Sequence, residues 1–106
     1  MINVIINRNR RGQIYGFIAT NHGKCIVCAA VSALVLNTIN SIELFTEETI
    51  SVKKKRRAGY IKLRLPDIET GKDNRDVDLL LSSMLLGLEN IRSQYPSQIS
   101  INDPNC

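Results

Sequence analysis

Apolar residues at every second position predict a strand over residues 2–7 at the start of the chain. Residues 14–20 are rich in β-branched and aromatic side chains, which favours a second strand. A short turn separates the two, and its Gly12 is free to adopt a positive φ. A loop of this length predicts that the two strands form an antiparallel hairpin.

A long segment without Gly or Pro follows, from Ile26 to Leu44. Its length favours a helix over a strand, despite several β-branched residues. Its polar stripe is narrow and consists of Ser32, Asn37, Asn40 and Ser41. We therefore expect this helix to be buried on most sides, against the sheet and a partner subunit.

The second half of the chain repeats the order of strands and helix. Residues 49–54 and 60–65 are expected to form a second hairpin, and Pro66 ends the latter strand. Apolar residues recur at helical spacing from 76 to 94, and 98–101 reads as a short last strand before a loose tail. The predicted fold class is α+β, in the order ββαββαβ, with an antiparallel or mixed sheet and two helices packed on one face.

The length of 106 residues is that of a single domain, 1–106. No uninterrupted apolar run reaches the roughly 18 residues of a membrane span, and residues 1–6 lack the pattern of a signal peptide. We therefore expect a cytoplasmic location. There the odd number of cysteines (Cys25, Cys28 and Cys106) favours a catalytic or metal-binding role over disulfides.

The formal net charge is +4, and much of the excess lies in the basic run at 53–57. Such a run can keep a hairpin tip soluble, and it can also attract nucleic acid or a ribosomal partner. No aromatic residue is interleaved within it, and no helix-turn-helix or zinc-finger pattern accompanies it. The solubilising role is therefore the simpler interpretation, with proximity to ribosomal RNA as the other.

His22, the only histidine, precedes Cys28 by six residues, and Cys28 falls in the first turn of the predicted first helix. The positive end of a helix dipole and a protonated imidazole both favour a thiolate. Helix-start N–H groups could also stabilise an oxyanion. Ser32 lies one turn later, where it could hydrogen-bond the pair, position a substrate, or simply bond back to a helix carbonyl. Spacing alone makes a catalytic dyad only one interpretation, beside a buried structural role for Cys28.

The surrounding residues closely resemble the bacterial ribosomal-processing cysteine protease (Prp) family. Members pair a strand ending in Gly-His-Ala with a helix beginning Val-Cys-Ala-Ala-Val-Ser-Ala-Leu, as residues 14–23 and 28–34 nearly do. The likeness continues at 59–63, at 84–91 and at 95–99, so it covers nearly the whole chain. The helix with the cysteine and the serine is its most specific part.

This resemblance implies a homodimeric cysteine endopeptidase that needs no cofactor. Members remove a short N-terminal extension from a large-subunit ribosomal protein, number twenty-seven in the standard naming, by cutting after an aromatic residue. By position, His22 and Cys28 match the catalytic pair and Ser32 the helix serine. The loop between the pair is several residues shorter than in many members. Cys25 stands where many carry an aspartate.

Three other interpretations remain open. His22, Cys25 and Cys28 are three apart and could hold a metal ion, although a fourth ligand is missing. Cys25 and Cys28 could also form a redox pair, or a reversible disulfide that masks the nucleophile. Finally, the chain could be a non-catalytic dimeric relative that binds the ribosome or a ribosomal protein.

Overall fold

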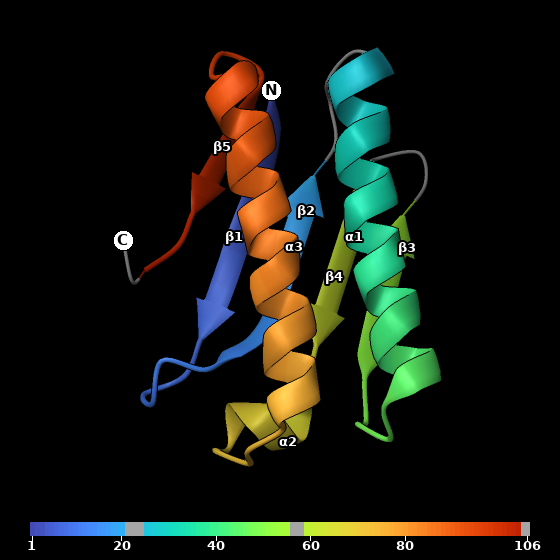
Figure 1. Cartoon of the computed structure of the whole chain (residues 1–106), viewed down its shortest axis with the longest axis vertical. Helices are drawn as coiled ribbons and strands as arrows, with labels where there is room; N and C mark the ends of the chain where they lie inside the picture. Colours follow the sequence, from blue (N-terminus) through green and yellow to red (C-terminus); the bar gives the residue numbers. More distant parts are fainter. Residues whose placement is uncertain (21–24, 56–58, 105–106) are drawn as a thin grey trace.

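A computed structural model describes residues 1–20, 25–55 and 59–104 as a sheet with helices against it (Figure 1). The strands are β1 (Ile2–Arg8), β2 (Ile14–Thr20), β3 (Ser51–Lys55), β4 (Tyr60–Arg64) and β5 (Ile99–Asn102). The helices are α1 (Cys25–Phe45), α2 (Pro66–Glu69) and α3 (Arg75–Gln94). All seven predicted elements are therefore confirmed, with boundaries that shift by one or two residues.

The five strands form one mixed sheet in the order β3-β4-β2-β1-β5. Both predicted hairpins are antiparallel, and β2 also pairs antiparallel with β4. β5 returns after α3 and pairs parallel with β1, with Ile2 opposite Ile99. Parallel pairing requires a crossover connection, which α3 provides here. The expected mixed α+β sheet is thus confirmed.

Alternation along the strands decides which side of the sheet the helices cover. Ile2, Val4 and Ile6 are buried, and across the register they lie beside Phe17 and Ala19 of β2. The intervening residues of β1 face away from the core, as period-two alternation requires. Figure 1 shows α1 and α3 side by side on the same face of the sheet, so the opposite face carries no helix in the described part of the chain.

α1 buries one side and leaves the other open. Val27, Val31 and Val35 are buried at spacings of four residues and continue into Ile39 and Ile42. On the outer side, Ile26 is 73% exposed and Leu44 is 77% exposed. The expectation of burial on most sides is therefore met on the inner side only. Residues Ile26–Phe45 are long and apolar enough to cross a membrane by length and composition, yet this helix supplies one wall of the core.

α3 begins and packs as its sequence suggests. The side chain of Asn74 caps it by accepting a hydrogen bond from the Val77 N–H at 3.1 Å. Val77, Leu81, Met84 and Leu88 are buried at helical spacing.

Two features differ from the sequence prediction. Pro66 ends the strand as expected, but it also opens a third, four-residue helix, α2, because proline fits the first turn of a helix. The tail is not loose at its start: Asp103 is buried and pairs with Arg8 at 2.7 Å, which ties the residue after β5 to the end of β1.

Candidate active site

Cys28 lies in the first turn of α1, three residues after the helix begins. Its thiol is half-buried and packs against the edge of the core. The first N–H groups of a helix have no partner within the helix and carry a partial positive charge. No acidic residue is present in the first turn of α1. The position therefore suits a sulfur that must carry negative charge.

The predicted base lies outside the described residues. β2 ends at Thr20 and α1 begins at Cys25, and the connection between them contains His22. The side chain of Cys25 is likewise outside the description. Pairing of His22 with Cys28, and any role of Cys25, therefore stay predictions.

A groove runs beside α1 from the turn that follows Cys28. Ser32 and Leu36 line it from α1, at spacings of four residues after Cys28. Its other wall comes from the β3–β4 hairpin, whose lining residues are Lys54, Lys55, Gly59, Tyr60 and Ile61. Among the described residues of its lining, apolar side chains lie beside Ser32 and two lysines, and none carries a carboxylate. Cys28 lies one turn before Ser32 on the same side of α1.

Sequence reasoning found the α1 side of this groove but missed the hairpin side. The register places Lys54 directly opposite Ile61, and Ile61 packs against the core. Both side chains therefore point towards α1. The alternation of residues 60–65 indicates which of them share a face of the sheet. The sequence does not indicate that β4 pairs with β2, and this pairing is what brings the hairpin under α1.

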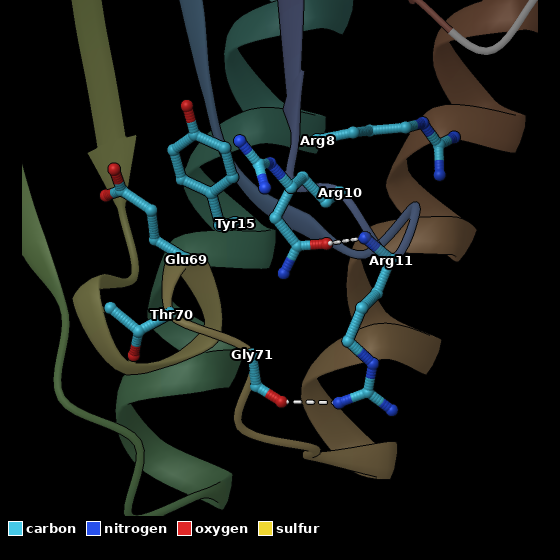
Figure 2. A pocket seen from close by; sticks show the side chains of 8 residues that line it. Arg8, Arg10, Arg11, Tyr15, Glu69, Thr70 and Gly71 are labelled. Carbon is cyan, nitrogen blue, oxygen red and sulfur yellow. Dashed lines mark hydrogen bonds between the residues drawn. The ribbon is translucent and has the colours of Figure 1, made fainter.

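Another pocket lies at the tip of the β1–β2 hairpin, at the opposite end of the molecule from the start of α1 (Figure 1). Figure 2 shows Arg10, Tyr15 and Thr70 around it, with Arg11 donating a hydrogen bond to the carbonyl oxygen of Gly71 at 2.6 Å. Glu69, which also lines it, pairs with Arg64 at 2.7 Å. Because most of its charged groups hold the turns together and none is a nucleophile, this pocket is not the candidate active site.

The metal hypothesis is not tested by the geometry. Among residues 1–20, 25–55 and 59–104, no group of three His, Cys, Asp or Glu side chains is placed to hold an ion. Two of the three suggested ligands, His22 and Cys25, have side chains outside that description.

Known proteins resemble this chain along almost its whole length. The sequence model of the family described as cysteine protease Prp matches residues 1–100. The ribosomal processing cysteine protease Prp of Staphylococcus aureus is 30% identical over 108 residues, which cover 96% of this chain and 98% of the relative.

Solved structures give the same result. A crystal structure of an essential ribosomal processing protease Prp from S. aureus, with a covalently linked product peptide, matches with a TM-score of 0.88. Its identity is 30%, and the match covers 97% of this chain and 99% of that one. The same protease with a substrate peptide matches with a TM-score of 0.87 at 28% identity, over 97% and 99% of the two chains. By sequence and by fold, this chain belongs to the Prp family of cysteine proteases.

Proposed function

We propose that the chain is a cysteine endopeptidase that removes the N-terminal extension of a large-subunit ribosomal protein, number twenty-seven in the standard naming. Cys28 is its nucleophile and His22 its base. The observation that carries the proposal is the position of Cys28, in the first turn of an apolar helix and one turn before Ser32, which lines a groove beside that helix. The S. aureus relative is a ribosomal processing cysteine protease, and its solved structures hold a product peptide and a substrate peptide. Both observations support the choice of substrate.

The chemistry needs only groups of this chain and the substrate. The Cys28 thiolate attacks the scissile carbonyl carbon, and the first N–H groups of α1 stabilise the oxyanion that forms. Protonated His22 gives its proton to the leaving amine, whose departure leaves an acyl-enzyme. Neutral His22 then takes a proton from water as the water attacks the thioester, and Cys28 leaves as thiolate.

The groove beside α1 binds the peptide on the acyl side of the scissile bond. Leu36 and Ile61 offer apolar surface to one substrate side chain, which suits the aromatic residue that the family resemblance implies. Ser32, between this surface and Cys28, is placed to position the peptide backbone. Cys25 has at most a supporting role.

The enzyme works as a homodimer in the cytoplasm. Large apolar side chains remain exposed on the outer side of the helix layer, including Leu79 at 67% and Leu86 at 65%. An exposed apolar surface of this kind marks an interface. The basic run at 53–57 brings the enzyme close to ribosomal RNA.

Cleavage of a synthetic peptide that spans the extension junction tests the function. We expect Cys28→Ala to reduce kcat/KM by at least roughly a thousandfold, because the acyl-enzyme can no longer form. Cys106→Ala, which removes a thiol outside the proposed machinery, is the matched control and should cleave like the unaltered chain. Mass spectrometry of the products locates the cut.

The opposite outcome is equally informative. Binding of the peptide without cleavage by the unaltered chain would identify a non-catalytic relative instead. Alkylation separates the roles within the dyad: iodoacetamide should modify Cys28 faster than the other cysteines near neutral pH, and more slowly in His22→Ala. Equal rates at all three cysteines would argue against an activated thiol.

A further inference from the structure

The acidic residues of this protein all lie outside the strands of the sheet. None of the five strands contains an aspartate or a glutamate. The strands do contain six basic residues: Arg8, Lys53, Lys54, Lys55, Lys62 and Arg64. Four of these six gather on β3 and β4 on the face that carries no helix, as the register shows.

Lys53 and Lys62 lie directly opposite each other in the β3–β4 pair. Facing like charges on neighbouring strands are destabilising. Lys55 and Arg64 lie one pair to either side on the same face, because side chains alternate along a strand. Only Arg64 of these four is in an ion pair within the described residues, with Glu69. The sheet thus holds three lysines together without a carboxylate to balance them.

The surroundings of these lysines are flat and partly apolar. Ile18 of β2 lies opposite Lys62 of β4. On its other side, Ile18 pairs with Ile5 of β1, which is 41% exposed. Where β3 ends and β4 begins, the ammonium of Lys55 lies 5.9 Å from the centre of the Tyr60 ring. Cations beside aliphatic and aromatic side chains on an open sheet are the surface that single-stranded nucleic acids use, with phosphates on the cations and bases on the apolar groups.

A second copy of this chain does not fit the same face. A two-fold symmetric contact would bring the lysines of one copy against those of the other. The exposed apolar side chains that a dimer needs belong to the helices instead, and Figure 1 shows the helices on the other side of the sheet from this face.

We infer that the open face of the sheet, centred on Lys53 and Lys62, binds single-stranded RNA. Its phosphates neutralise the facing lysines, which relieves their repulsion. The choice of RNA as the polyanion rests on the contact with ribosomal RNA that is proposed above. The centre of the face is separate from the groove beside Cys28, since neither Lys53 nor Lys62 lines that groove, whereas Lys55 and Tyr60 border both.

Fluorescence anisotropy with a labelled oligouridine tests the inference. We expect binding that weakens with salt, and a loss of roughly tenfold in affinity in Lys53→Gln/Lys62→Gln. The slope of log K against log salt should become shallower by about 1.4, because each phosphate contact to a single strand contributes roughly 0.7. Lys54→Gln is the matched control: it changes the same charge on the same strand but on the helix side, and should bind nearly as before.

Three results would overturn the inference. The first is no binding of the oligouridine at low salt. The second is an equal loss in Lys54→Gln, which would mean that net charge and not this face is responsible. The third is equally tight binding of a glutamate-rich peptide through the same two lysines. Peptide cleavage by Lys53→Gln/Lys62→Gln should stay unchanged, so a failure of RNA binding is distinguishable from a failure of the protease assignment.

Discussion

Two arginines of the β1–β2 hairpin form ion pairs that differ in burial. Arg8 pairs with Asp103 through two hydrogen bonds, of 2.7 and 2.9 Å, and the Asp103 side chain is only 3% exposed. Arg11 pairs with Asp73 at 3.2 Å, where the Asp73 side chain is 77% exposed. A two-point contact that excludes water is worth far more than an exposed pair, in which solvent screens the charges.

We therefore expect Asp103→Ala to lower the free energy of unfolding by about 2 kcal/mol, since it leaves a largely buried guanidinium without its carboxylate. Asp73→Ala, the matched control, should cost less than about 0.5 kcal/mol. Urea denaturation followed by circular dichroism measures both. Equal costs for the two variants would mean that the contact of Asp103 with Arg8 contributes little.

At the scale of the elements, the helix that carries Cys28 is positioned by close packing against α3. A methyl group at Gly87 of α3 would meet the Cδ2 atom of Leu34 of α1 at 2.6 Å. Glycine at this position therefore lets the two helices approach, although it costs up to about 1 kcal/mol in helix propensity. Leu34 is two residues beyond Ser32, so this contact lies on the other side of α1 from the groove that Ser32 lines.

Gly87→Val should destabilise the protein by about 2 kcal/mol, because the added side chain overlaps Leu34 of α1 and forces it out of its packed position. Ser82→Val, at an exposed position of α3, should change the free energy of unfolding by less than about 0.5 kcal/mol. Thermal denaturation compares the two. Combining Gly87→Val with Leu34→Ala should recover part of the loss, and no recovery would place the strain elsewhere.

Local sequence was enough to predict every strand and the two long helices: alternation or helical spacing for β1, β4 and α3, composition for β2, the length of an apolar segment for α1, and the hairpin for β3, which is exposed along its length. It was not enough where one residue belongs to two elements or where burial depends on a distant partner. Pro66 ends β4 and also begins α2, and a four-residue helix has too few turns to show a period. The burial of Asp103 depends on Arg8, 95 residues earlier, and no local pattern reports such a partner.

The candidate site was predictable to a similar degree. Cys28 and Ser32 could be placed on one helix face from their spacing, and in the structure Ser32 lines the groove. Lys54 and Ile61 could not, because their position under α1 follows from the strand order, in which β4 inserts next to β2. Long-range strand pairing is the part of the fold that sequence spacing leaves open.

Across the whole molecule, the two layers present opposite chemistry to their surroundings. The helix layer exposes large apolar side chains, among them Ile26, Leu44 and Phe45 of α1. The sheet exposes lysines on its free face. The thiol belongs to α1, and the groove lies between α1 and the β3–β4 hairpin. The candidate site is therefore located where the apolar helix layer meets the lysine-bearing sheet. Each side can then bind its own partner without covering the groove.

The dimer that we propose for the apolar side can be tested with two leucines of α3. Leu79 and Leu86 are seven residues apart, so they lie on the same side of the helix, and both are about two-thirds exposed. Each substitution acts twice in a symmetric dimer. With about 2 kcal/mol for each buried leucine, Leu79→Lys/Leu86→Lys should raise the dissociation constant of the dimer by at least roughly a hundredfold in sedimentation equilibrium.

Ile5→Lys, on the open sheet face, should leave the dissociation constant of the dimer unchanged. A dimer that resists the leucine variant but dissociates with Ile5→Lys would place the interface on the sheet, and would then also exclude RNA from that face.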